Sequence, residues 1–291
     1  SSPKNQHLPR AKFAPPLKLP DISFKMSPAL KSQIGGPEAF FMGQLFWRVD
    51  SIAQLTRGLT LYNSLGFSLY DNFEFANPSA SETPHVRSDI QHYLKYGKNN
   101  ISKMKIDYIW SPGKDWLARI DFGLLEEMFG GVGGEIMYRP FKSKYALGLV
   151  AHRVKQRDFD QRFSFRDYKV NTAHLQFFYQ LPSDVTAAVL AGKYLAGDRG
   201  VTLDLSRRFK TGFRLGVFAT KTNLSAEEFG EGSFDKGFYF QIPTDIFLSN
   251  YSTGSISFGF HPLTKDGGAL LFNHNALWSL YGNSDYDANI R

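Results

Sequence analysis

Residues 59–70 read Leu-Thr-Leu-Tyr-Asn-Ser-Leu-Gly-Phe-Ser-Leu-Tyr, and this stretch decides the fold. Apolar side chains occupy every second position with a single exception, Asn63: they are Leu59, Leu61, Leu65, Phe67 and Leu69. Small, polar or Tyr side chains occupy the positions between them. Because successive side chains of a strand point to opposite faces, a period of two over this length predicts a long β-strand.

The same alternation recurs along the chain, with turn residues between the segments. It is visible in residues 103–110, 116–124, 174–181, 201–209, 213–220 and 255–261. No amphipathic helix of comparable length competes with these segments. The sequence therefore predicts an all-β, antiparallel fold of roughly 12–13 strands.

Two architectures produce many alternating strands. A soluble sandwich or barrel buries its apolar faces, whereas a transmembrane β-barrel turns them toward lipid and encloses a polar interior. The segments are long, and ~9–11 residues span a bilayer when tilted, while soluble strands average ~5–6. Aromatic residues also collect near the strand ends: Phe40, Phe41, Trp110, Trp116, Phe141, Tyr145, Tyr179, Tyr239, Phe247 and Tyr251. These features favour an antiparallel transmembrane β-barrel, or half of a larger one, over a soluble carbohydrate-binding sandwich.

Composition narrows the function classes. The 291 residues include no Cys, which excludes a disulfide scaffold or a thiolate metal site. The apolar runs are far shorter than the ~18 residues that a transmembrane helix needs. The net charge is +7, but much of the basic excess lies in the first 31 residues, so nucleic acid is not the expected partner.

The chain divides into two parts by composition. Residues 1–37 are rich in Pro, Lys and Ser and are expected to form a lead-in or linker. Residues 38–291 are expected to form the barrel domain. A long insert near residues 74–100 interrupts the strand pattern and could hold a short helix, and loops of this length are often functional.

Charged residues on the polar faces are the candidate lining of an interior path. They are Arg119, Asp121, Arg139, Lys193, Asp204, Arg208 and Arg214. A hydrated surface of mixed sign suits polyhydroxylated or anionic polymers. The alternative is that these residues form internal salt bridges that only brace the barrel.

A second set of charged residues lies in expected loops. These candidate loop residues are Glu126, Glu127, Arg157, Asp158, Asp198, Arg199, Glu231 and Asp235. The two glutamates precede a glycine-rich run that is expected to form a tight hairpin or bulge. The chain has no phosphate-binding loop, no Gly-x-Ser-x-Gly elbow, no His-Glu-x-x-His motif and no calcium-loop spacing. We therefore expect no catalytic site, no cofactor and no metal.

Five runs of sequence resemble the YjbH family, which includes the GfcD-like proteins. They are EEMFGGVGGEIMYRPF (126–141), VKQRDF (154–159), YLAGDRGVTLDLS (194–206), FGEGSFDKG (229–237) and PLTKDGGA (262–269). The family belongs to exopolysaccharide and capsule operons of Gram-negative bacteria. The resemblance implies an outer-membrane β-barrel that takes part in polysaccharide secretion. Its members are longer, with two barrel-like halves, so this chain resembles one later portion.

The resulting expectation is a passive polar conduit, or an accessory to one, in the bacterial outer membrane. Its expected partners are the exopolysaccharide, outer-membrane lipids, and the missing barrel half or other proteins of the secretion operon. Because no nucleotide site is visible, energy for export would come from elsewhere. Two alternatives stay open, a general solute porin and a membrane-embedded enzyme that acts on glycan or lipid.

Overall fold

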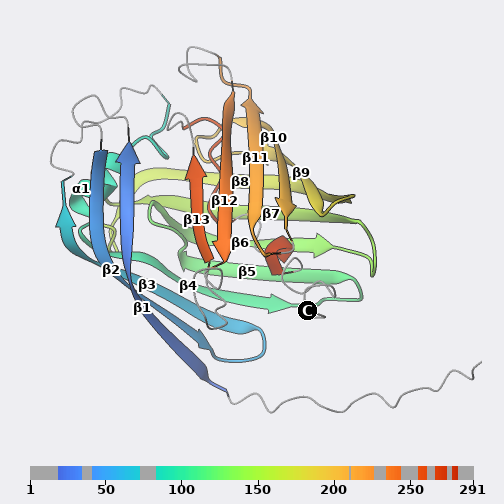
Figure 1. Cartoon of the computed structure of the whole chain (residues 1–291), viewed down its shortest axis with the longest axis horizontal. Helices are drawn as coiled ribbons and strands as arrows, with labels where there is room; N and C mark the ends of the chain where they lie inside the picture. Colours follow the sequence, from blue (N-terminus) through green and yellow to red (C-terminus); the bar gives the residue numbers. More distant parts are fainter. Residues whose placement is uncertain are drawn as a thin grey trace, which may run out of the picture.

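A computed structural model describes residues 19–34, 41–72, 83–209, 211–225, 234–243, 255–260, 266–273 and 277–280. Within them, thirteen strands form one antiparallel sheet in which every strand pairs with its neighbours in the chain (Figure 1). The elements are β1 (Asp21–Ile34), β2 (Phe41–Gln54), β3 (Leu59–Asp71), α1 (Ile90–Tyr96), β4 (Asn99–Trp110), β5 (Trp116–Leu124), β6 (Phe129–Tyr138), β7 (Tyr145–Arg157), β8 (Phe165–Leu181), β9 (Val185–Lys193), β10 (Arg199–Arg208), β11 (Arg214–Thr222), β12 (Asp235–Pro243) and β13 (Ser255–Phe260). The predicted all-β antiparallel fold and its strand number are confirmed.

Apolar side chains lie on the exposed face of the sheet and charged side chains on the buried face, which is the reverse of a soluble protein. In β5, Ile120 and Phe122 are 52% and 55% exposed, whereas Arg119 and Asp121, which alternate with them, are 1% and 2% exposed. The same order holds in β4, where Tyr108 is exposed and its neighbour Asp107 is buried. The period of two thus places apolar side chains outside and charged side chains inside.

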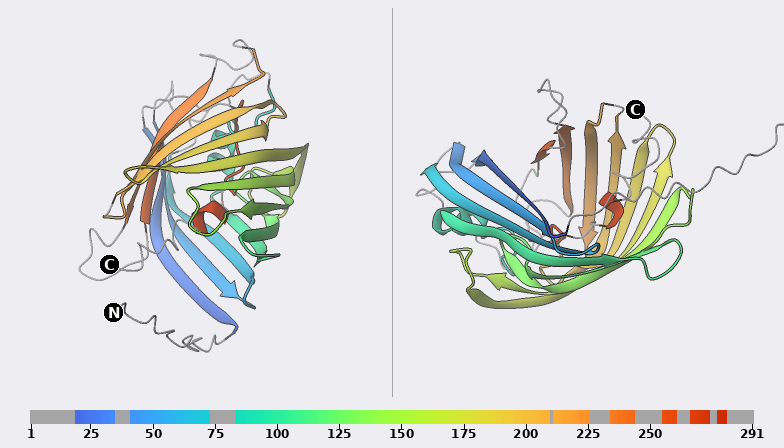
Figure 2. Two further views of the ribbon diagram at one scale, coloured as in Figure 1. Left: turned by 90° about the vertical axis from the view of Figure 1, so that its right-hand side faces the viewer. Right: turned by 90° about the horizontal axis from the view of Figure 1, so that it is seen from below.

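The sheet does not close on itself within the described residues. Figure 2 shows it bent into a trough, with β1 and β13 as the two edges of the opening. The order of pairing runs from β1 to β13 without a pair between these two strands. That the chain forms half of a larger barrel stays a prediction.

The first strand lies in residues that were expected to form a lead-in, so the sheet begins at Asp21 and not after residue 37. Ile22, Phe24 and Met26 alternate with polar residues and are exposed on the outer face like the apolar rows of the other strands. The lysines and Pro28 obscured this alternation in the sequence. Proline within sheets is found mainly on edge strands, and β1 is an edge strand within the described residues.

Connections differ at the two ends of the strands. One end, here called the loop end, carries residues 72–98, 125–128, 158–164, 194–198 and 223–234. The other, here called the turn end, carries residues 55–58, 111–115, 139–144, 182–184, 209–213 and 244–254. As expected, the long insert contains a short helix, α1, of seven residues. The insert, which is the longest connection of the sheet, thus lies at the loop end.

A segment near the end of the chain, described as residues 266–273 and 277–280 and here called the inner segment, lies on the concave face of the trough (Figure 2). At the loop end, Ala269 and Leu271 join a buried core with Tyr93 of α1 and Phe129 of β6. At the turn end, Leu277 packs into a second core with Met137, Ala146, Phe178, Ala188 and Leu190. The inner segment therefore runs from the loop end to the turn end, opposite in direction to β13.

No helix among the described residues has both the length and the apolar character to cross a membrane.

Candidate functional site

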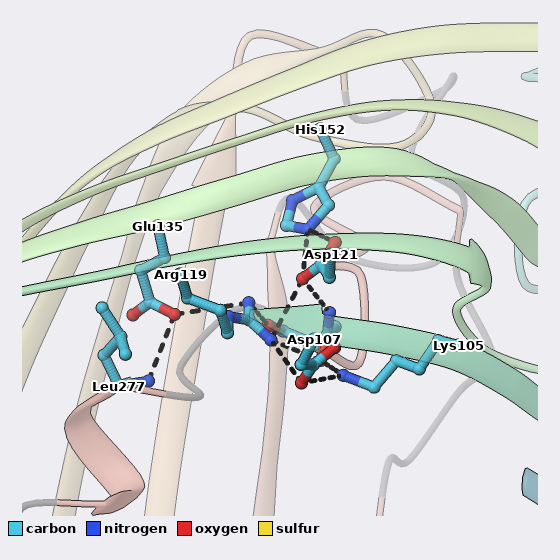
Figure 3. Close-up of polar contacts among 8 residues, drawn as sticks. Lys105, Asp107, Arg119, Asp121, Glu135, His152 and Leu277 are labelled. Carbon is cyan, nitrogen blue, oxygen red and sulfur yellow. Dashed lines mark hydrogen bonds and ion pairs between the residues drawn. The ribbon is translucent and has the colours of Figure 1, made fainter. Parts of the chain in front are cut away.

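The centre of the concave face is a buried network of charges on β4, β5 and β6 (Figure 3). The Arg119 guanidinium lies 3.1 Å from Asp121, 3.4 Å from Glu135 and 3.7 Å from Asp107. Lys105 Nζ donates to Asp107 at 2.8 Å. All five side chains are at most 6% exposed, so the two cations and three carboxylates interact with one another and not with bulk water.

Asn273 of the inner segment completes this network. Its Oδ1 accepts hydrogen bonds from Lys105 Nζ at 2.9 Å and from Arg119 at 3.0 Å, while its Nδ2 donates to Asp121 at 2.6 Å. Arg119 donates a further bond to the Asn273 carbonyl oxygen at 2.9 Å. His152 of β7 lies 3.1 Å from Asp121 on the opposite side. One amide side chain thus holds the segment to three charged residues of the wall.

These contacts define the surroundings of Arg119 and Asp121, the two residues of β5 that were expected to line an interior path. Both point to the concave side, as predicted, but neither side chain has exposed area. The inner segment covers them, so they are not in contact with a water-filled path in this state. Their contacts correspond to the bracing alternative, because each is held by ion pairs within the wall and by Asn273.

A second polar cluster on β10, β11 and β12 is only partly buried. Asp204 accepts a hydrogen bond from the Tyr239 hydroxyl at 3.0 Å, and Arg214 donates to Ser206 Oγ at 3.0 Å. The Arg214 guanidinium also lies 5.9 Å from the centre of the Tyr239 ring. Tyr239 was expected at a membrane interface, but it faces the interior. Arg208 follows at the exposed end of the same inner row of β10.

Two candidates for the interior path are placed elsewhere. Lys193 pairs with Ala173 and Arg199, which are both exposed on the outer face, so Lys193 also points outward and its predicted interior position is wrong. Leu190 is buried against the inner segment, so both faces of β9 are apolar and its alternation is weak. Arg139 lies just after β6, not in a strand, with its guanidinium 5.4 Å from the Trp278 ring centre.

Glu126 is the loop candidate that contacts both the insert and the inner segment. Its carboxylate accepts two bonds from the Arg87 guanidinium, at 2.6 and 3.1 Å, and one from the Phe272 backbone N–H at 2.9 Å. Arg87 in turn donates to the Leu270 carbonyl at 2.7 Å. Glu126 therefore ties the insert and the inner segment to the wall. The glycines that follow it lie in β6, and the tight turn precedes them.

Arg157 is also structural. Its guanidinium is fully buried and donates to the carbonyl oxygens of Glu126, Ile101, Gln161 and Arg162 at 2.5–3.1 Å. The next residue, Asp158, accepts a bond from the Phe159 N–H within the loop. These two candidates fix the loop between β7 and β8, because together they satisfy its backbone groups.

Asp198 lies in the loop between β9 and β10 and accepts a hydrogen bond from the Gly268 N–H at 2.8 Å. Burial raises the pKa of the Asp198 carboxyl above its usual range, against the opposing effect of that bond. Burial likewise raises the pKa of Tyr194 in this loop to about 12. Asp198 therefore holds the inner segment at a cost in desolvation, since its second oxygen has no partner.

The remaining loop candidates do not gather into one site. Glu127 forms an ion pair of 2.6 Å with Lys31 of β1, and Arg199 is exposed on the outer face. Asp235 is the first residue of β12. Glu231 lies outside the described residues. In the part of the chain that the structure describes, no three acidic or His side chains come together as metal ligands.

The sequence did not indicate the residues of the inner segment as part of a site. Asn273 and Leu277 contact the wall, and Asp266 accepts bonds from the N–H groups of Arg87 and Ser88 at 2.7 and 2.9 Å. The only available signal was the run 262–269, which entered as part of the family resemblance. A segment without periodicity carries no local pattern that reveals where it packs.

The outer face has an ordered boundary at the turn end. Trp110, Trp116, Tyr138, Tyr145 and Tyr179 follow one another on β4 to β8. Paired residues can be followed from Trp110 on β4 across four strand spacings, and they lead to Leu175 on β8. Tyr179, the aromatic residue of β8, lies four residues from Leu175 toward the turn end. With ~3.3 Å per residue and ~4.8 Å per strand, the aromatic line is inclined by about 35° to the pairing direction. Strands of membrane barrels are tilted by ~35–45°, so this line would lie level in a membrane.

An open, meandering antiparallel sheet with an apolar outer face, an aromatic line at its turn end and charges inside defines the class of porin-like β-barrel proteins. The chain belongs to the YjbH family, since the family described as "YjbH: Exopolysaccharide biosynthesis protein YbjH" matches residues 3–282. It is 37% identical over 283 residues to a protein of Escherichia coli K12 named "Uncharacterized lipoprotein YjbH". The match covers 93% of this chain and 40% of that protein, so the chain spans about two fifths of its relative.

Solved structures with a similar trace are outer-membrane proteins. OmpF of Salmonella typhi, in complex with daunomycin, is 10% identical with a TM-score of 0.41, over 82% of this chain and 89% of that chain. The trimer form of OmpT of Vibrio cholerae is 9% identical with a TM-score of 0.32, over 83% of this chain and 89% of that chain.

Proposed function

We propose that this chain is a barrel-forming portion of an outer-membrane protein that exports an exopolysaccharide. The observation that carries the proposal is the inverted order of the two faces, with exposed apolar rows outside and charges inside. In water, so many exposed apolar side chains would drive aggregation, whereas in lipid they are the stable arrangement. Membership of a family described by exopolysaccharide biosynthesis supplies the class of cargo.

The two edge strands of the sheet, β1 and β13, would need a further barrel-forming partner. In a lipid bilayer, unpaired N–H and C=O groups of an edge strand cost several kcal/mol each, so a spanning sheet must close. Within the described residues β1 and β13 pair on one side only. The rest of a longer protein, or a second barrel-forming chain, would therefore complete the wall.

The sugar path would run along the part of the inner face that the inner segment leaves accessible. Asp204, Arg214 and Tyr239 combine a carboxylate, a guanidinium and an aromatic ring within one cluster. Hydroxyl groups of a sugar bond to the charged groups, and a pyranose ring packs on the aromatic face. The polymer would slide past such weak contacts, because each can exchange for the next one.

The orientation of the sheet is tested with two adjacent cysteines, because the 291 residues contain none. Leu203 is 45% exposed on the outer face, and its neighbour Asp204 lies on the inner face. Each is replaced by Cys in the whole protein in its own membrane. We expect the Leu203→Cys variant to react with a lipid-soluble maleimide only, and the Asp204→Cys variant to react with a charged, water-soluble one.

Export is measured in matched strains. Asp204→Ala and Arg214→Ala are expected to lower the secreted polysaccharide at an unchanged protein level, while Val217→Ala on the outer face leaves it unchanged. A protein that fractionates without detergent, or labels with the charged reagent at position 203, contradicts the membrane arrangement. Uptake of unrelated small solutes with unchanged polysaccharide secretion would instead favour a general porin. The absence of enzymatic activity remains a prediction.

A further inference from the structure

The outer face carries a second ordered line, at the loop end of β7 to β12. It consists of basic side chains that point outward: Arg153, Lys155, Lys169, Lys193, Arg199, Lys221 and Lys236. Asp167 is the only acidic residue that the described strands place on this face among them. No salt bridge joins any of the seven to another described residue.

The cations follow the same inclination as the aromatic line. Paired residues can be followed from Lys236 on β12 across five strand spacings to β7. They are Ala219, Leu203, Val189, Phe177 and, on β7, Leu147. Arg153, the cation of β7, lies six residues from Leu147 toward the loop end. At ~3.3 Å per residue and ~4.8 Å per strand the cation line is inclined by about 40°, within the ~35–45° tilt of barrel strands. Tilted strands therefore bring the cations to one height.

The two lines bound an apolar band. On β7, Tyr145 and Arg153 are eight residues apart on the same face, and on β10 Val201, Leu203 and Leu205 lie between Arg199 and Arg207. Eight residues tilted by about 40° span roughly 20 Å, close to the ~25 Å apolar band of a membrane barrel. The cations thus lie where the hydrocarbon of a bilayer would end and the headgroups begin.

A groove lies on this boundary between β8, β9 and β10. Its volume is about 540 Å³, and its lining includes Asn171, Ala173, Lys193 and Arg199 from the outer face. Thr172 and two glycines of the wall, Gly192 and Gly200, complete the lining. An amide and two cations beside the apolar rows of the outer face suit a headgroup whose phosphate is attached to acyl chains.

We propose that this basic line binds lipids whose headgroups carry anionic phosphate groups, in the leaflet at the loop end of the sheet. The inference rests on the proposed membrane location. A lipid fits better than the exported polymer, because the cations share the face of Leu203 and Phe177, which lipid chains contact, and not the face of Asp204. The lipids would fix the height and tilt of the wall on β7 to β12, where the loops are long.

The test compares two clusters on the same outer face. The whole protein is extracted from its membrane and reconstituted in vesicles of phosphatidylcholine with or without phosphatidic acid, and retained lipid is counted by native mass spectrometry. The triple variant Lys193→Gln, Arg199→Gln, Lys221→Gln removes the centre of the line. Arg207→Gln, on the same strand and face as Arg199 but at the turn end, is the control.

Each cation near a charged membrane surface contributes about fivefold to binding, so the triple variant should retain phosphatidic acid about 100-fold less well. The control should stay within twofold of the parent, and added salt should weaken lipid retention by the parent and by the control, but much less by the triple variant. Equal retention of both lipids by the parent, once inserted, overturns the inference but leaves the membrane proposal standing. Displacement of the lipid by inorganic phosphate or by an anionic polysaccharide also overturns it, in favour of those ligands. Failure to insert in any vesicle contradicts the proposed function itself.

Discussion

Replacement of Asn273 is the strongest test of how the inner segment is held, because this one neutral side chain bonds to three charged side chains of the wall. Asn273→Ala removes three hydrogen bonds to charged partners, at 2.9, 3.0 and 2.6 Å. Bonds of this kind contribute about 1.5–3 kcal/mol each. We take the lower end, since Lys105 keeps Asp107 at 2.8 Å and Arg119 keeps Asp121 at 3.1 Å. The expected loss of docking free energy is therefore about 4.5 kcal/mol.

The loss is measured through a cysteine at Ala269, a 9% exposed position of the inner segment. In an Ala269→Cys background, labelling by a charged maleimide requires the segment to leave the wall. A loss of about 4.5 kcal/mol raises the undocked fraction, and hence the labelling rate, by about 2,000-fold. If the docking free energy of the inner segment is small in the parent, the labelling rate of the variant should approach that of an exposed cysteine.

Phe272→Ala is the matched control, because the neighbouring side chain is 77% exposed. Its ring contacts Arg87 at 4.4 Å, a cation–π contact that is worth about 0.5–1 kcal/mol at an exposed site. The control should therefore change labelling by no more than about sixfold. If Asn273→Ala changes labelling no more than this control does, the charged network does not hold the segment and our reading of the site is refuted.

Three further predictions concern the same wall. Burial raises the pKa of Asp198, so ionisation of this carboxyl weakens docking of the inner segment as the pH rises from the unfolded value of ~3.9 through the folded pKa. Asp198→Asn should flatten this pH dependence, and in the Ala269→Cys background it should be labelled no faster than the parent at neutral pH. Gly133→Ala places a Cβ 2.1 Å from the His152 ring and should lower the free energy of unfolding by about 1–3 kcal/mol in a heat-modifiability assay, whereas Gly259→Ala, with open space around it, should not. Leu277→Ala empties a fully buried position and should destabilise docking by about 2–5 kcal/mol, seen as faster labelling at the turn end; unchanged rates would contradict the packing described there.

The strand pattern could be predicted because each strand has different environments on its two faces. In β5 the outer Ile120 and the inner Asp121 differ so strongly in polarity that the alternation is unmistakable in the sequence. Where the inner segment adds an apolar contact on the inside, as it does at Leu190 of β9, the contrast disappears and Lys193 was placed on the wrong face. β1 was missed for a related reason, since Pro28 and the lysines around it resemble a linker.

The inner segment itself could not be predicted, because its contacts are with residues far away in the chain. Asn273 lies 152 positions from Asp121 and 168 from Lys105, and no local period records such pairings. Arg119 and Asp121 of β5 were expected on the inner face, and the structure places them there. Whether they would meet water or protein depended on a segment whose position only the folded chain defines.

The odd number of strands among the described residues has a topological consequence. A chain that begins β1 at the turn end and crosses the sheet thirteen times leaves β13 at the loop end, opposite to the end where it began. The inner segment makes one more passage, through the trough, and brings Leu277 to the turn end, where Asp21 also lies. The described part of the chain therefore makes an even number of passages, although its sheet has an odd number of strands.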